Sequence, residues 1–224
     1  LKTMNKTTRS NFITYAMVIV AFVVVQAMAS TGGISSSLKG QLVPICAYIV
    51  MAISLNLTVG VLGELSLGHA GFMSVGAFSG VIAAIYFGQT IENTAVVMIL
   101  AMAVGGFFAA VVGVLVGVPV LRLSGDYLAI VTLAFGEIIK GIVNNLYVGM
   151  DANGLHFCMI KNTLEMEGGK MLLNGPMGLT GIPRIATFTM GFVLIMVCLI
   201  VIFNLVNSKS GRAIMALRDN KIAA

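Results

Sequence analysis

Long runs of apolar residues, nearly free of charge, recur along the chain and limit what it can fold into. The run from Thr94 to Val118 contains no Asp, Glu, Lys or Arg. About 20 such residues in an α-helix cross the roughly 30 Å hydrocarbon core of a bilayer. Charged residues make up 9% of the sequence, against about 25% in soluble domains. These features predict a membrane protein.

Six of these runs predict an all-α fold, a polytopic bundle of about six transmembrane helices. We expect residues 1–224 to form a single membrane domain. The predicted spans are residues 12–30, 42–62, 65–87, 94–118, 126–148 and 185–206. A polar segment, residues 149–184, separates the last two spans, and we interpret it as a long loop.

The basic residues indicate how the spans are oriented, because Lys and Arg are enriched in cytoplasmic loops. We place the N-terminus and residues 207–224 in the cytoplasm, with alternation between them. The cytoplasmic side then receives Lys2, Lys6, Arg9, Arg122, Lys209, Arg212, Arg218 and Lys221. The outer side receives Lys39, Lys161, Lys170 and Arg184. The net charge of +5 therefore reflects topology, and we expect membrane lipid and no nucleic acid as a partner.

Glycines mark two kinds of place in the spans. Two pairs, Gly76 with Gly80 and Gly113 with Gly117, have the GxxxG spacing that lets helix backbones approach closely. A second group surrounds the stretch GELSLGHAG and predicts a break between two apolar helices. This break is either a tight cytoplasmic turn or part of a re-entrant element near a pathway, where irregular backbone must be covered by protein or line a wet cavity. The group consists of Gly60, Gly63, Gly68 and Gly71.

The predicted fifth span carries charge at membrane depth. Its uninterrupted apolar part is too short to cross, so Glu137 and Lys140 must enter the bilayer with it. Each costs about 2.5–3.5 kcal/mol at a helix centre, and both should therefore face protein or water. Their spacing of three lets them meet on one helical face. They form either an internal ion pair that fixes the helix or part of a translocation route.

The motifs of common enzymes are missing from the sequence. It contains no GxxxxGK[ST] phosphate-binding loop, no HExxH zinc motif and no GxSxG nucleophile motif. Its three cysteines show no CxxC spacing, and there are only two histidines. We expect a transport protein that is not an enzyme and holds no cofactor or metal.

The stretch SKSGRAIMALRDNKIAA, residues 208–224, follows the last apolar run. Its polar residues do not gather on one side of a helical wheel, so a helix lying on the membrane surface fits poorly. The small and apolar residues from Ala213 to Leu217 instead predict a short helix inserted into a groove of a cytoplasmic partner, with charges at the rim.

Four stretches together resemble the LivM-type permeases of bacterial branched-chain amino acid ABC importers. They are LNLTVGVLGELSLGHAGFMSVGAF, RLSGDYLAIVTLAFGEIIKGIVNN, NGPMGLTGIP and SKSGRAIMALRDNKIAA. The resemblance implies a subunit of the bacterial inner membrane that imports leucine, isoleucine or valine. It also implies three kinds of partner: a second permease subunit, cytoplasmic ATP-binding subunits that hydrolyse ATP, and an extracytoplasmic solute-binding protein.

In that family the last stretch is the signature loop that docks on the ATPase. The matching positions are Gly211, Arg212, Ala213, Ala216, Leu217, Arg218, Asp219, Ala223 and Ala224. The chain departs from the family at Lys221, where an acid is common, and in its longer, more polar residues 149–173. Because the family continues with further spans, we expect the chain to be a C-terminally truncated permease.

Pathway residues are predicted from polar groups near the glycine break and in the charged span: Asn56, Ser66, His69 and Glu137. The alternative to an ABC permease is an ion-coupled secondary transporter or channel, with Glu137 and His69 carrying protons. Within the family, urea or a short amide is an alternative substrate.

Overall fold

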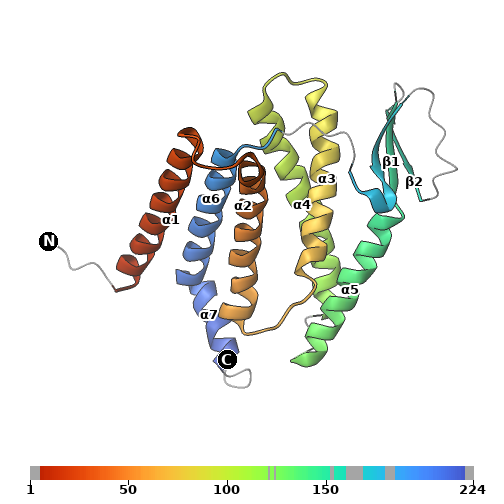
Figure 1. The fold of residues 1–224 in the computed structure, drawn as a ribbon. Helices are drawn as coiled ribbons and strands as arrows, with labels where there is room; N and C mark the ends of the chain where they lie inside the picture. The colour runs from red at the N-terminus through yellow and green to blue at the C-terminus, as the bar shows by residue number, and fades with distance from the viewer. Residues whose placement is uncertain are drawn as a thin grey trace. The chain divides into compact units, whose positions relative to one another are not determined.

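The computed structural model describes residues 6–120, 122–123, 125–151, 154–159, 169–179 and 185–219 (Figure 1). The chain divides into two compact units, one made of Leu1–Gly63 with Ala186–Ala224 and the other of Glu64–Ile185. Helices dominate both units, so the predicted helical bundle is confirmed.

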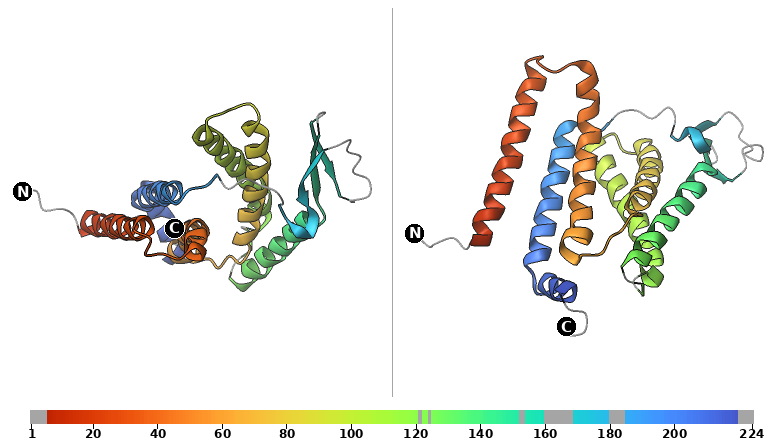
Figure 2. Two further views of the ribbon diagram at one scale, coloured as in Figure 1. Left: turned by 45° about the horizontal axis from the view of Figure 1, so that its top comes forward. Right: turned by 60° about the horizontal axis from the view of Figure 1, so that its bottom comes forward.

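The first unit contains three long helices, a π-helical turn and a short final helix. They are α1 (Lys6–Ser30), α2 (Ser36–Asn56), η1 (Leu57–Leu62), α6 (Phe188–Asn207) and α7 (Lys209–Asp219). The Ser35 side chain caps α2 by accepting a hydrogen bond from the Leu38 amide at 3.4 Å. Helix α2 continues directly into η1, and the two form one helical stretch of 27 residues. Figure 2 shows α7 turning away from the line of α6.

The core of this unit lies where α2 packs against α6. It is formed by the buried residues Cys46, Ile195 and Leu199. The backbones approach closely, because a Cβ placed on Gly191 would lie 2.8 Å from the Cβ of Cys46. Helix α1 joins through aromatic stacking, with the rings of Phe22 and Phe192 4.0 Å apart between centroids. Small residues and aromatic pairs thus hold the three helices together.

The second unit contains three helices followed by a small sheet. Its elements are α3 (His69–Gly88), α4 (Thr94–Val120), α5 (Asp126–Asn144), β1 (Tyr147–Asp151), β2 (Gly154–Cys158), β3 (Lys170–Asn174) and the 3₁₀ turn η3 (Gly175–Met177). Gly63 to Gly68 lie outside any helix, so the break predicted from the glycine group is present. It joins η1 of the first unit to α3 of the second.

Helices α3 and α4 make the closest helix pair of this unit. Gly76 and Gly80 face Gly105, and a Cβ on Gly105 would lie 2.5 Å from the carbonyl oxygen of Gly76. The first predicted GxxxG pair therefore packs as expected. The second does not: apart from neighbouring residues of α4 itself, no described part of the chain lies within 4 Å of a Cβ placed on Gly113 or Gly117.

Residues 149–184, predicted to be a loop, contribute most of a three-stranded antiparallel sheet in the order β2-β1-β3, whose strand β1 begins at Tyr147. The pairing of β1 with β3 shifts its register at a bulge between Val148 and Gly149. Val148 and Leu173 are fully buried and give the sheet its own small core. The Gly175 amide donates to the Leu146 carbonyl oxygen at 3.2 Å, which ties the end of β3 to the end of α5.

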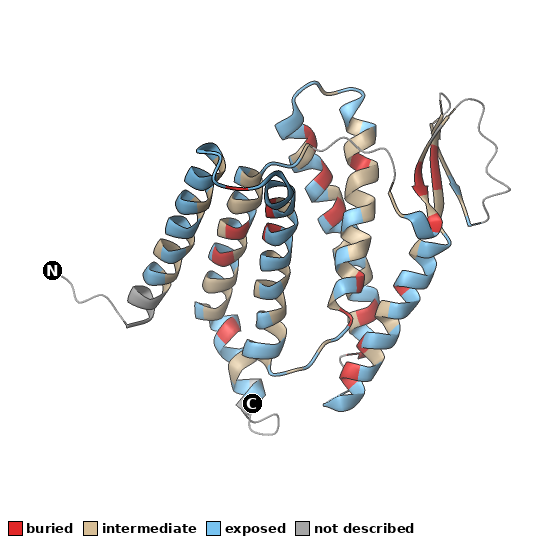
Figure 3. Ribbon diagram, viewed as in Figure 1, coloured by how far each residue is buried: buried red, intermediate tan, exposed pale blue. Residues whose placement is uncertain are grey.

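Five helices in the described residues are long and apolar enough to cross a membrane. They are Asn11–Ser30, Ser36–Leu62, His69–Gly88, Thr94–Val120 and Phe188–Asn207. Their surfaces remain largely exposed, and no residue of α1 from Asn11 onward is buried (Figure 3). Exposed apolar helices of this kind suit contact with lipid or with other membrane helices.

The predicted fifth span, residues 126–148, needs correction. The helix there, α5, ends at Asn144, and the predicted last residues, 147 and 148, begin strand β1. Helix α5 is not among the five membrane-capable helices, and it carries Asp126, Glu137 and Lys140. The other predictions find their helices but miss some ends: α2 begins six residues before the predicted 42, and α3 begins at His69 rather than 65.

Candidate functional site

A tight corner joins α6 to α7 in the first unit. The Ser208 hydroxyl donates to the Leu205 carbonyl oxygen at 2.6 Å and accepts from the Gly211 amide at 3.0 Å. Gly211 is buried, and a Cβ there would lie 2.6 Å from the Val206 carbonyl oxygen. A side chain does not fit in this corner, so Gly211 fixes the direction in which α7 leaves α6.

Helix α7 has two different sides. Gly211 is buried and Ile214 and Met215 are half-buried, and these three residues lie on one side of the helix. The opposite side is exposed and carries Lys209, Arg212, Ala213 and Ala216. The sequence predicted that residues 213–217 enter a partner together. The structure instead turns Ile214 and Met215 toward their own chain and leaves the two alanines outward.

Arg218 follows the same side of α7 by its spacing from Gly211 and Ile214, and its side chain is exposed. Its Nη1 donates a hydrogen bond of 2.6 Å to the main-chain carbonyl oxygen of Gly60 in η1. The side-chain carbons pass close to Gly63, where a Cβ would lie 3.0 Å from Cγ of Arg218. Gly63 has φ +80°, a left-handed conformation that other residues adopt at a cost. The basic group predicted at the rim of a partner thus contacts the chain's own π-helical turn.

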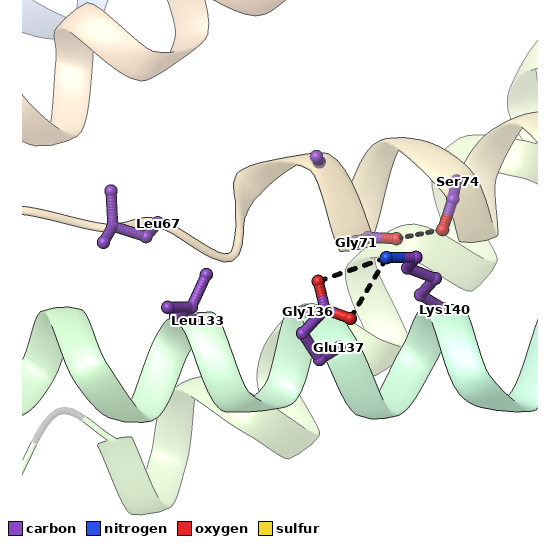
Figure 4. Close-up of a pocket in the computed structure, with 8 residues that line it drawn as sticks. Leu67, Gly71, Ser74, Leu133, Gly136, Glu137 and Lys140 are labelled. Atoms are coloured by element: carbon purple, nitrogen blue, oxygen red, sulfur yellow. Dashed lines mark hydrogen bonds and ion pairs between the residues drawn. The ribbon is translucent and has the colours of Figure 1, made fainter.

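The second unit contains a pocket of about 250 Å³ between α3, α5 and the break that precedes α3. Its lining residues are Leu67, Ala70, Gly71, Ser74, Leu133, Gly136, Glu137 and Lys140 (Figure 4). Backbones form much of its floor, because a Cβ on Gly71 would lie 3.2 Å from Cα of Gly136.

The break is fastened to α5 by a buried hydroxyl. Thr132 accepts a hydrogen bond from the Leu67 amide at 3.1 Å and donates to the Ala129 carbonyl oxygen at 2.9 Å. Its own carbonyl group lies against Gly68, where a Cβ would collide with it. Thr132 therefore bonds both within its own helix and to Leu67, which lies 65 residues earlier in the sequence.

Glu137 and Lys140 meet as their spacing predicts. Nζ of Lys140 lies 3.2 Å from Oε2 of Glu137, and both side chains are about two-thirds exposed in this chain. The pair joins two residues of the same helix and opens on the pocket (Figure 4). Exposed i,i+3 pairs contribute only about 0.3–0.5 kcal/mol to helix stability. The pair therefore does little to hold the fold and leaves both charges accessible.

Comparison with known proteins identifies the chain's relatives. Residues 37–224 match the family described as branched-chain amino acid transport system / permease component. This chain belongs to that family. It is 35% identical over 187 residues to the high-affinity branched-chain amino acid transport system permease protein LivM of Escherichia coli (strain K12). It is 34% identical over 187 residues to the protein of the same name from Salmonella typhimurium (strain LT2). No solved structure matches the chain.

Each of these two alignments covers 79% of this chain and 42% of the relative. The chain thus spans less than half the length of the relatives it matches. The family description and the names of both relatives are those of transport-system permeases. Among the described residues, no three His, Cys, Asp or Glu side chains are grouped so that they could hold a metal ion.

Of the four predicted pathway residues, only Glu137 lines the pocket. Ser66 and His69 are half-buried beside the break but are not among the lining residues. Asn56 lies in the other unit, at the end of α2, where its Oδ1 covers Gly60.

Sequence reasoning also left pocket residues out. Ser74 and Gly136 line the pocket and were not predicted as pathway residues. Lys140 also lines it, and the sequence offered this residue, with Glu137, either an internal ion pair or a place on a translocation route. Spacing offered a signal, because Ser74 stands three residues after Gly71, and Gly136 and Lys140 flank Glu137 on the same helix.

The predicted coupling residues fall into four groups. Gly211 and Arg218 lie on the inward side of α7, and Arg212, Ala213 and Ala216 lie on its outward side. Two more, Leu217 and Asp219, belong to the helix by their backbone. Ala223 and Ala224 lie outside the described residues.

Proposed function

We propose that this chain is part of the membrane-spanning permease of an ATP-driven importer of leucine, isoleucine and valine in a bacterial inner membrane. Its partners would be a second permease subunit, cytoplasmic ATP-binding subunits and an extracytoplasmic solute-binding protein. Support comes from membership of the permease family and from the names of its LivM relatives.

The proposal that this chain is coupled to ATP hydrolysis is supported by the exposed, outward side of α7. This helix follows a membrane-capable helix after a single residue, Ser208, and exposes Arg212, Ala213 and Ala216. Two small side chains let a partner approach the helix backbone, and Arg212 offers a charge at the edge of the contact. We propose that this side docks on the ATP-binding subunit, with residues 207–224 and the N-terminus in the cytoplasm.

We propose that the pocket between α3 and α5 lies on the translocation route. At about 250 Å³ it is smaller than the roughly 300–1,000 Å³ of pockets for drug-sized ligands, and it suits a molecule such as a free amino acid. Glu137 and Lys140 complement the ammonium and carboxylate groups of a zwitterion. Leu67 and Leu133 offer an apolar surface to its side chain.

ATP would drive transport by shifting the permease between two states. Closure of the ATP-binding subunits would move α7, and the permease would change from outward-facing to inward-facing. The chain itself performs no covalent chemistry in this scheme.

Uptake in proteoliposomes tests the function. The full-length gene product is reconstituted with the second permease subunit, the ATP-binding subunits and the binding protein, and uptake of labelled leucine, isoleucine, valine and urea is measured. We expect uptake of the three amino acids only with ATP on the side of the ATP-binding subunits. Uptake driven by a proton gradient without ATP would contradict the proposal and favour an ion-coupled transporter. ATP-driven uptake of urea alone would keep the coupling and change the substrate.

A further inference from the structure

The carbonyl group that Arg218 contacts has a particular place in the fold. The 27-residue stretch of α2 and η1 ends at Leu62, and the Gly63 amide closes it by donating to the Thr58 carbonyl oxygen. The last four carbonyl groups of a helix have no amide partner within the helix. Gly60 is among those last four residues, so its oxygen needs a donor from elsewhere.

A cation suits this position for two reasons. The end of a helix carries the partial negative charge of the macrodipole, and a positive side chain there is stabilising. A hydrogen bond from a charged donor is also stronger than one between neutral groups. The 2.6 Å contact between Arg218 and the Gly60 oxygen meets both conditions. Arg218 therefore acts as a C-terminal cap for the α2–η1 stretch, from 158 residues away.

The neighbouring glycines make room for this cap. Gly63 lets the stem of Arg218 pass, since a Cβ there would lie 3.0 Å from Cγ and 3.2 Å from Cδ of Arg218. Asn56 covers the other side of Gly60, where a Cβ would collide with Oδ1. Because Gly60 and Gly63 have no side chains, the carbonyl oxygen of Gly60 remains accessible to Arg218.

Helix α7 is consequently attached to two membrane-capable helices in different ways. Ser208 connects it covalently to α6, and Arg218 connects it to the end of the α2–η1 stretch. A displacement of α7 is transmitted to α6 through the covalent chain. It reaches α2 through the contacts between α7 and η1, among which Arg218 makes the charged hydrogen bond.

We propose that Arg218 is a positioning residue that makes η1 and α2 move together with α7 when a partner displaces α7. This inference rests on the proposed function, because it assigns a path to the motion that ATP supplies. It gives Arg218 a role within its own chain, where the sequence had placed it at the edge of the partner.

Two measurements test it. In the full-length complex, leucine uptake per ATP hydrolysed is compared for the native protein, Arg218→Gln, Arg218→Lys and the control Arg122→Gln. Arg122 is an exposed arginine in the turn before α5, outside the α7–η1 contact. We expect Arg218→Gln to lower uptake per ATP about tenfold, within the roughly 5–150-fold range of coupling between sites. Arg218→Lys should recover part of the loss because it keeps a charged donor, and Arg122→Gln should match the native protein.

The second measurement needs neither ATP nor a partner. Spin labels are attached to cysteines at Val59 and Ser210, both exposed, in a full-length chain whose native cysteines are alanine. We expect the dipolar coupling to report a narrow distribution of distances between the two labels in the protein with Arg218. In Arg218→Gln this distribution should be broader.

The outcomes separate this inference from the proposed function. Unchanged dipolar coupling in Arg218→Gln, together with weaker binding of the ATP-binding subunit, would overturn the inference and make Arg218 a partner contact. Unchanged uptake per ATP would also overturn it. If the native complex takes up no leucine with ATP, the proposed function fails, and the spin-label result still decides whether Arg218 holds α7 to η1.

Discussion

Two regions of the molecule hold a helix end in place by different means. At α7 and η1, one long charged side chain reaches a carbonyl oxygen, with the contact made by Arg218. At the break before α3, the backbone itself packs on α5 through Gly68 and Gly71, and the hydroxyl of Thr132 fastens it. The charges of the second region, Glu137 and Lys140, take no part in that packing.

The two kinds of contact suit the two regions to different roles. A contact made by one flexible side chain can transmit or release motion, whereas close backbone packing is rigid. The rigid region leaves its charges accessible at a pocket, as a substrate site requires. We therefore expect substitutions at α7 to change coupling, and substitutions at the pocket to change substrate affinity or stability.

The largest expected effect comes from the outward side of α7. Ala216→Trp places a large side chain where a partner must approach closely. Losses at the centre of an interface reach about 2–4 kcal/mol, so binding of the ATP-binding subunit should weaken about 30-fold or more. Pull-down of that subunit with the full-length protein measures this, and Ala216→Ser is the matched control. Native binding by Ala216→Trp would remove this side of α7 from the interface.

One added methyl group at Gly68 should disrupt the packing of the break before α3 on α5. A Cβ at Gly68 collides with the Thr132 carbonyl group, and overpacking of this kind costs about 1–3 kcal/mol. We expect Gly68→Ala to lower the thermal stability of the purified protein in detergent. Gly113→Ala is the control, because no described residue outside the neighbouring turns of α4 lies within 4 Å of a Cβ placed there. Equal melting temperatures for both variants would mean that the break does not pack on α5 as described.

The accessible charges predict a smaller effect, confined to substrate. Glu137→Gln should raise the KM for leucine uptake about tenfold, or about 1.4 kcal/mol, with maximal ATP hydrolysis unchanged. The double variant Glu137→Lys with Lys140→Glu keeps an ion pair but reverses its direction. It should not restore KM if the pair orients a zwitterion. Recovery in the double variant would show that the pair matters only for the helix.

The smallest effect concerns the hydroxyl of Thr132. Thr132→Val removes the partner of the Leu67 amide, and a hydrogen bond of this kind contributes about 1 kcal/mol. We expect a small fall in thermal stability, which Thr132→Ser should largely avoid. A destabilisation as large as that of Gly68→Ala would mean that the hydroxyl, rather than the backbone packing, holds the break.

Much of the helical framework follows from the sequence, because charge-free apolar runs of about 20 residues have few alternatives in a membrane. The small sheet was missed because its strands are only five residues long and include a bulge, so no alternating pattern is visible. The π-helical turn was missed because Leu57–Leu62 reads as ordinary apolar helix.

The candidate sites were predicted in part. The glycine group predicted the break before α3, and the spacing of Glu137 and Lys140 predicted their pairing. The inward direction of Arg218 could not be predicted, because it depends on a carbonyl group 158 residues earlier in the chain. A helical wheel shows which residues share a side and does not show what lies against that side.

Protection of α7 from chemical labelling would show whether this helix docks on the ATP-binding subunit. Single cysteines at Ala213 and Ala216, in a full-length protein without native cysteines, are treated with a membrane-impermeant maleimide in inverted membrane vesicles. Both should react when the ATP-binding subunits have been removed and should be protected when these subunits are added back. Reaction that is unchanged by the ATP-binding subunits, or that occurs only from the extracytoplasmic side, would contradict the assignment of α7 as the coupling helix.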